Sequence, residues 1–319
     1  MKNKLLLIFI ILISQLSFGQ NVKVVDQNNA NLRLKYVEAI RLENQNQVGK
    51  ALEIYEYLVT QMPEEKLFYV KYFDLLFKTE KYEKLEQVLP EFIDQYPDNE
   101  KAKIDLGKLY YIQQDTVKAE KTWTKYLEEA NYSKLFTRHL FYTMISLRQR
   151  DKAEEILLKS RQVNKNKTLF SKELGDYYFS SGRYGKSVTE YIKFLEEDDR
   201  NINYISDMLL RFPREDKVFQ QVDSVLVSKF SKKNGVHLHK LRSDYLFNNE
   251  KYTVAAEEIF TIESLTGNTG ENIIEFSNDI MKVKAYDFAK QFFRQVLKRK
   301  EFKSIYNEIL LSLAKVEER

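Results

Sequence analysis

The segment GRYGKS, residues 182–187, contains the residue types of a phosphate-binding loop. In such a loop four residues separate the two glycines, so that backbone N–H groups can surround a phosphate, and the loop follows a β-strand. Here two residues separate Gly182 from Gly185, and Ser180 stands where the other glycine is needed. We therefore expect no nucleotide at this segment.

The acidic segment EEDDRNINY has some of the ligands of a calcium-binding loop. A loop that began at Asp199 would have asparagine at two ligand positions. However, Tyr204 stands where a glycine makes the turn, and Leu210 stands where a glutamate holds the ion. The segment is therefore expected to be the solvated end of a helix.

Other sets of catalytic or metal-binding residues are missing from the sequence. The three histidines are His139, His237 and His239, and the last two, two residues apart, would point to different faces of a helix. The chain has no cysteine to complete a zinc site, and it has no G-x-S-x-G or H-E-x-x-H motif. We expect a protein without enzymatic activity, metal or cofactor.

The composition is that of a folded, helical protein. Apolar residues make up 43% of the 319 residues and charged residues 31%, which is more apolar content than a disordered chain carries. Only 9 glycines and 4 prolines are available to form turns and linkers. Few residues therefore interrupt helices.

A period of 34 residues runs through the chain. Steps of 34 through Ala119 give mostly small residues: Ala51, Leu85, Ala119, Ala153, Ser187, Gln221, Ala255 and Ala289. The series through Gly107 is small at five of eight positions: Ala39, Phe73, Gly107, Phe141, Gly175, Leu209, Ser243 and Ser277. The series through Tyr110 is apolar or aromatic throughout: Leu42, Leu76, Tyr110, Met144, Tyr178, Phe212, Leu246 and Ile280. The same is true of the series through Trp123: Tyr55, Leu89, Trp123, Leu157, Tyr191, Val225, Ile259 and Phe293. A fixed period without insertions indicates a solenoid.

This pattern resembles the tetratricopeptide repeat (TPR), in which Leu-Gly, Tyr, Ala, an aromatic residue and Pro take set positions of a 34-residue helix–turn–helix unit. Counted from Leu32, eight repeats cover residues 32–303, and Pro63 and Pro97 take the proline position. The resemblance implies an all-α fold, a right-handed superhelical solenoid of eight repeats. Residues 304–319 fit the helix that caps such an array, with Ile305, Ile309, Leu310, Leu313 and Val316 on one stripe.

Repeat 6 departs from this pattern. Phe212-Pro213 falls near the end of its first helix, and proline inside a helix costs about 3 kcal/mol. We expect this helix to end early or to kink. At the other end of the array, residues 21–31 are largely polar, and residues 20–31 are expected to form a flexible leader or an irregular N-cap.

The resemblance also implies where a partner would bind. In tetratricopeptide arrays the first helices line a concave groove through positions 2, 5, 9 and 12. The candidate groove residues are Tyr36, Ile40, Val70, Asp74, Phe77, Lys108, Tyr111, Arg138, Tyr142, Asp176 and Phe179. An apolar groove with a few charges suits an extended or helical peptide. The alternative is that several of these side chains only pack against the next helix.

One binding mode of the family is not reproduced. Its carboxylate clamp grips acidic C-terminal tails with Lys and Asn at set positions. Lys172 and Lys240 stand at position 5, but Asp176 and Asp244 stand at position 9. Binding of acidic chaperone tails is therefore not expected.

The first 19 residues predict export. A basic start, the apolar run from Leu5 to Ile13 and small residues before Gln20 are the parts of a signal peptide, although an uncleaved anchor is an alternative. The chain has no cysteine, so it is not expected to be a bacterial lipoprotein. Loss of the signal would reduce the formal net charge from +4 to +2, which gives no reason to expect nucleic acid.

Together these features predict a periplasmic or secreted protein with no integral membrane span after signal removal. The expected function is a non-catalytic scaffold or adaptor of the bacterial envelope that binds a protein or peptide in the concave groove. The alternative is a periplasmic chaperone, or an accessory subunit of a secretion or envelope enzyme complex.

Overall fold

The computed structural model describes residues 30–229 and 235–318, and within these ranges every regular element is a helix. The predicted signal peptide, residues 1–19, and residues 20–29 of the predicted leader lie outside the described residues. Residues 30 and 31, which we assigned to the flexible leader, belong to a helix over 30–44. The all-α prediction is confirmed for the described part of the chain.

The chain forms two compact units, which meet in sequence between Thr143 and Met144. The helices of the first unit are residues 30–44, α2 (Val48–Gln61), α3 (Lys66–Lys78), α4 (Tyr82–Gln95), α5 (Glu100–Ile112) and α6 (Thr116–Glu129), and α7 (Lys134–Ser146) crosses the boundary. The second unit contains α8 (Arg150–Val163), α9 (Ser171–Ser180), α10 (Tyr184–Glu197), η1 (Asp199–Asn201), α11 (Ile202–Leu209), α12 (Asp216–Ser228), α13 (Gly235–Asn248), α14 (Tyr252–Thr266), α15 (Glu271–Lys282), α16 (Tyr286–Leu297), η2 (Lys300–Ile305) and α17 (Tyr306–Glu317).

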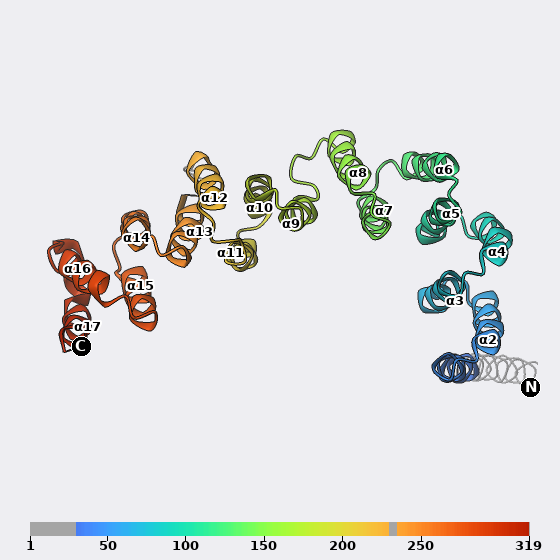
Figure 1. Ribbon diagram of the computed structural model, residues 1–319, viewed down its shortest axis with the longest axis horizontal. Coiled ribbons are helices and arrows are strands. Elements are labelled where there is room, and N and C mark those ends of the chain that lie inside the picture. The colour runs from blue at the N-terminus through green and yellow to red at the C-terminus, as the bar shows by residue number, and fades with distance from the viewer. Residues whose placement is uncertain (1–29, 230–234, 319) are drawn as a thin grey trace, which may run out of the picture. The chain divides into compact units, whose positions relative to one another are not determined.

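Consecutive helices pack as hairpins, for example α5 with α6 and α13 with α14 (Figure 1). The second helices begin at Val48, Tyr82, Thr116, Arg150, Tyr184, Tyr252 and Tyr286, which are separated by 34 residues or a multiple of it. The predicted repeat of helix–turn–helix hairpins is therefore confirmed.

The turn inside each hairpin has a conformation that explains part of the period. Its middle residue is left-handed at equivalent positions: Asn46, Glu80, Gln114, Arg148, Gly182, Glu250 and Lys284. The following N–H bonds back to the carbonyl five residues earlier, as from Asp115 to Tyr110 (3.0 Å) and from Lys251 to Leu246 (2.9 Å). This bond closes the helix end as in a Schellman motif. The apolar series through Tyr110 thus marks the residue that accepts it.

The small series through Ala119 lies where the hairpin helices meet. Its members in the regular repeats are all 0% exposed: Ala51, Leu85, Ala119, Ala153, Ser187, Ala255 and Ala289. Trp123, one turn later on α6, is 2% exposed, and its indole N–H donates to the Ile104 carbonyl at 3.0 Å. The packing of these positions against the first helix explains why the sequence repeats them.

Repeat 6 is irregular, as its proline predicts. Helix α11 ends at Leu209, four residues before Pro213, and no left-handed residue occurs in the connection to α12. The longer connection shifts the buried face of α12 by one residue. Val222 and Leu226 are 0% exposed, whereas Gln221 is exposed and Val225 is only partly buried against the same core.

The C-terminal helix α17 covers the end of the array. Ile305, Ile309 and Val316 are buried in one core with Phe292 and Phe302. Leu310 was expected on the same stripe, but it is 50% exposed. It follows Ile309 by one residue, about 100° further round the helix, and so faces away from the core.

Candidate binding groove

The groove residues expected in repeats 1 to 3 are largely engaged in packing. Tyr36 lies with its ring centroid 5.5 Å from that of Phe68, and Phe77 is 9% exposed with the Lys108 ammonium 4.1 Å from its ring centroid. The ring centroid of Tyr111 lies 6.1 Å from that of Trp123. Packing thus accounts for the contacts of these aromatic residues.

The other expected residues of the first compact unit differ in exposure. Ile40, Val70 and Arg138 are partly buried. Asp74 is exposed and lies 3.4 Å from the ammonium of Lys101. Tyr142 on α7 is 51% exposed, which makes it the most open of the expected aromatic residues. These residues therefore differ in how open they are to a partner.

The two expected residues of repeat 5 are also held within the fold. Phe179 stacks on Phe212 with ring centroids 5.2 Å apart. The carboxylate of Asp176 accepts hydrogen bonds from Lys172 Nζ (2.7 Å), Tyr191 Oη (2.9 Å) and Tyr204 Oη (2.6 Å). Three donors from the chain itself occupy this acidic group.

A cavity of about 500 Å³ lies in the second compact unit, among the first helices of repeats 6 to 8. Side chains from α11, α13, α14 and α15 line it, with α13 contributing Lys240, Asp244 and Phe247. These three stand at positions 5, 9 and 12 of repeat 7, the positions that the repeat assigns to a groove. Our prediction concentrated on repeats 1 to 5, where aromatic residues are denser, and missed this site.

The cavity combines an apolar surface with charged groups. Phe247, Phe276 and Val283 supply apolar surface. The charged lining residues are Arg214, Lys240, Asp244, Glu250, Glu275 and Asp279. Acidic groups therefore outnumber basic groups around the cavity.

Asp244 is a charged residue of this cavity whose pKa departs from its ordinary value. Burial raises the pKa of its carboxyl group, and the nearby charges of Glu275 and Asp279 raise it further. The hydrogen bond from Ser206 (2.9 Å) and the charge of Lys240 act in the opposite direction. The site thus holds a carboxylate whose ionised form is poorly compensated.

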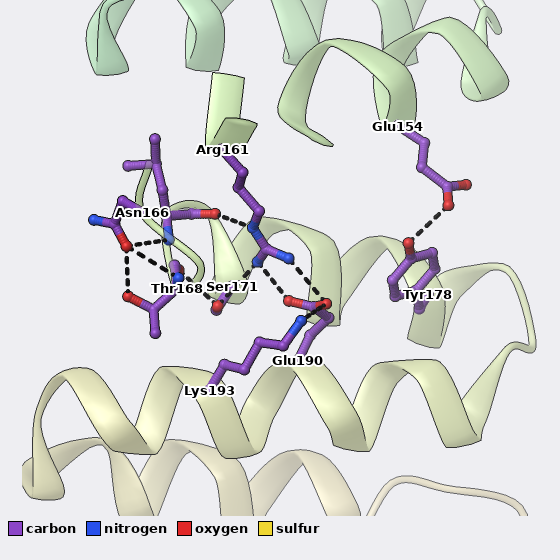
Figure 2. A network of polar contacts seen from close by, with 9 residues as sticks. Glu154, Arg161, Asn166, Thr168, Ser171, Tyr178, Glu190 and Lys193 are labelled. Carbon is purple, nitrogen blue, oxygen red and sulfur yellow. Dashed lines mark hydrogen bonds and ion pairs between the residues drawn. The ribbon is translucent and has the colours of Figure 1, made fainter. Parts of the chain in front are cut away.

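A separate polar network lies at the junction of α8, α9 and α10 (Figure 2). Arg161 and Glu190 are 8% and 6% exposed, and the Arg161 guanidinium donates to both Glu190 carboxylate oxygens. Arg161 also donates to the Leu169 carbonyl (2.6 Å) and to Ser171 Oγ (3.0 Å). Because the pair's charged atoms bond to one another and to their neighbours, we interpret this network as a structural junction.

The motifs that suggested ligands have structural roles instead. Gly182 is the left-handed residue of a helix turn, and the Ser187 hydroxyl donates to the Gly175 carbonyl at 2.8 Å. The GRYGKS segment therefore follows helix α9 and not a strand. In the acidic segment, Asp198 accepts from the Arg200 N–H at 3.0 Å and caps η1.

In residues 30–229 and 235–318, no group of three or more His, Asp or Glu side chains is placed to share a metal ion. No helix in these ranges is both long and apolar enough to cross a membrane.

The 34-residue hairpins, their left-handed turns and the buried small residues on the second helices decide the fold. The described residues form a solenoid of helical hairpins that resembles the tetratricopeptide repeat. No family model and no curated protein matches the chain.

Three solved structures illustrate the similarity. A tetratricopeptide repeat protein from Parabacteroides merdae is 14% identical, with 89% of this chain and 98% of that chain covered and a TM-score of 0.31. The TPR domain of P58(IPK) is 13% identical, with 91% and 100% covered and a TM-score of 0.23. The human IFIT1 dimer with m7Gppp-AAAA is 13% identical, with 90% and 72% covered and a TM-score of 0.30.

Proposed function

We propose that this TPR-like protein is a non-catalytic scaffold or adaptor, and that it binds a segment of a partner protein in the cavity among α11, α13, α14 and α15. The observation that carries this proposal is the cavity itself, which lies on the first helices of repeats 6 to 8. Its volume of about 500 Å³ is within the range of binding pockets. Stacked helical repeats present surfaces of this kind to partners.

The cavity supports a peptide occupant through its mixture of surfaces. Phe247 and Phe276 offer apolar contact, and Asn248 and Asn272 offer amide groups near them. A peptide segment presents the same mixture of apolar side chains and backbone hydrogen-bonding groups.

The proposal is tested by site-specific photo-crosslinking. A photoreactive amino acid at Phe247 is expected to capture one predominant protein, whereas the same group at the exposed Tyr57 captures none. The captured protein is then identified and purified, and its binding to wild type and to Phe247→Ser is measured. Loss of binding in the variant supports the scaffold. Broad capture of many unfolded proteins would instead favour the alternative of a periplasmic chaperone, and an equal yield at both positions would contradict a groove.

We also propose that the protein acts outside the cytoplasm, in the bacterial envelope or after secretion. The support is the basic and apolar composition of residues 1–19. N-terminal sequencing of the protein from fractionated cells tests this. A chain that retains Met1 and is recovered with cytosolic markers would contradict export.

A further inference from the structure

Repeats 5 and 7 have an aspartate at the same position, but its hydrogen-bond donors differ between the two repeats. Asp176 on α9 and Asp244 on α13 both stand at position 9 of their repeats, two periods apart. As described above, three donors of the chain saturate Asp176. Among the described residues, Ser206 Oγ is the sole hydrogen-bond donor to Asp244 (2.9 Å).

The difference follows from the residues that replace the donors two periods later. Tyr191 becomes Ile259 and Tyr204 becomes Asn272, so two hydroxyl donors are lost. Asn272 instead donates through Nδ2 to Glu263 at 2.9 Å.

The lysine is retained but engaged elsewhere. Lys240 corresponds to Lys172, and its ammonium lies 3.6 Å from Glu275, whereas the ammonium of Lys172 bonds directly to Asp176 at 2.7 Å. Repeat 7 therefore keeps the carboxylate without the hydrogen bonds from a lysine and two tyrosines that repeat 5 supplies.

The surroundings of Asp244 add to this imbalance. Glu275 and Asp279 face the same cavity, and Arg214 on its border donates instead to Asn248 Oδ1 at 2.7 Å. A partly buried carboxylate gains most from a donor that carries positive charge, because such bonds are about twice as strong as neutral ones. Repeat 5 shows the kind of group that suits this position in this fold, a lysine ammonium with aromatic hydroxyls beside it.

We propose that the cavity is specific for a basic segment of a partner protein, and that a lysine or arginine side chain of this segment binds the carboxylate of Asp244. Adjacent apolar residues of the segment pack on Phe247 and Phe276. The inference depends on the proposed function, because it names the chemistry of the partner for the same cavity. It also predicts the opposite preference from a clamp for acidic tails.

The test is selection of a displayed library of random 12-residue peptides against the full-length protein. Peptides enriched on wild type are expected to carry lysine or arginine next to apolar residues, and peptides with net negative charge are expected to be depleted. The most enriched peptide is then synthesised with a fluorescent label, and its dissociation constant is measured by anisotropy. Asp244→Asn should weaken binding about tenfold or more, as expected for the loss of one charge-assisted hydrogen bond.

Two further variants serve as controls. Asp207→Asn removes the same charge from an exposed site on α11 outside the cavity, and it should leave affinity within twofold. Asn272→Tyr restores the hydroxyl that Tyr204 supplies in repeat 5, so it should weaken binding by occupying Asp244 from within. Circular dichroism melting confirms that each variant is folded before it is measured.

Each outcome separates the inference from the proposed function. Enriched peptides that lack basic residues, or basic peptides that bind Asp244→Asn as tightly as wild type, would overturn the inference and leave a peptide groove standing. If no peptide is enriched on wild type, the groove itself is refuted, and both proposals fail.

Discussion

The indole ring of Trp123 occupies the space in which a side chain at Gly107 would lie. A Cβ atom at Gly107 would be 2.3 Å from Trp123 Nε1, and one at Gly175 would be 2.4 Å from Tyr191 Cε1. Both pairs join the first helix of a hairpin to its second helix. In repeats 3 and 5 a glycine on the first helix is therefore matched to a large ring on the second. In repeat 2 Phe73 and Leu89 stand at these positions.

We expect Gly107→Ala to destabilise the protein, although alanine normally favours a helix over glycine by up to about 1 kcal/mol. The added methyl group would overlap a ring that is 2% exposed and hydrogen-bonded to Ile104. Overpacking of this kind costs about 1–3 kcal/mol. Urea denaturation followed by circular dichroism measures the change in the free energy of unfolding.

The matched control is Gly49→Ala in α2, where a Cβ atom would meet no heavy atom within 4 Å. This variant should be neutral or slightly more stable. Gly107→Ala combined with Trp123→Leu should lose less than the sum of the two single changes, since the smaller side chain leaves room for the methyl group. Equal melting of Gly107→Ala and wild type would contradict the close approach.

A second prediction concerns the buried pair in Figure 2. Glu190→Gln leaves the guanidinium of Arg161 buried without its counter-ion, so we expect a loss of about 3 kcal/mol in the free energy of unfolding. Replacing both residues by leucine should recover part of this loss, because no charge then remains buried. Chemical denaturation of the three proteins measures both effects.

An exposed ion pair provides the comparison for this prediction. Lys84 and Glu56 are 2.8 Å apart, and both side chains are more than 40% exposed. Lys84→Ala should therefore cost less than about 1 kcal/mol. If Glu190→Gln cost no more than Lys84→Ala, the network would not be the junction that its geometry indicates.

A third prediction concerns repeat 6. Helix α11 has 8 residues and lacks the left-handed turn that closes the first helices of the regular repeats. Fewer intrahelical bonds and the missing left-handed turn lower the free energy of local opening. Amides of α11 should exchange with deuterium faster than those of α9 and α13, as measured by mass spectrometry of peptic fragments. Equal protection of the three helices would show that the irregular turn carries no local instability.

The sequence predicts the hairpins well because the same residue types recur at one spacing in several repeats. A single alanine indicates little, but Ala119 and its equivalents recur at one spacing and are all buried in the regular repeats. The register of repeat 6 could not be predicted in the same way. Pro213 predicts a break in the repeat, but it does not predict that Val222 and Leu226, and not Gln221 and Val225, are fully buried.

The site is harder to predict because an apolar residue at a groove position looks the same in the sequence whether its side chain lines a groove or packs against a neighbouring helix. Phe77 and Tyr111 recur at groove positions, yet they contact Lys108 and Trp123 of their own chain. Asp244 has fewer internal hydrogen-bond donors than Asp176 because Ile259 and Asn272 stand two periods after Tyr191 and Tyr204. A comparison of repeat 5 with repeat 7 in the sequence contains that signal, but only the contacts of Asp176 give it meaning.

The last prediction concerns the pH dependence of Asp244. Burial raises its folded pKa, the hydrogen bond from Ser206 and the charge of Lys240 act against this, and the charges of Glu275 and Asp279 add smaller increases. The folded state therefore holds this proton more tightly than the unfolded state. The contribution to stability is fully present below the ordinary aspartate pKa of 3.8, and it is lost as the pH rises through the raised folded value.

We expect Asp244→Asn to be more stable than wild type at pH 7, with a difference that shrinks as the pH falls toward 4. Urea denaturation of both proteins at a series of pH values isolates this group, since the other carboxyl groups are common to both. Asp198→Asn should show the opposite trend, because the hydrogen bonds from Arg200 lower the pKa of Asp198 to about 2. Its carboxylate therefore stabilises the fold above pH 3.8, and this contribution is lost in acid. A difference between Asp244→Asn and wild type that does not vary with pH would mean that the Asp244 carboxylate is compensated in the fold, and that the cavity does not need a cation from a partner.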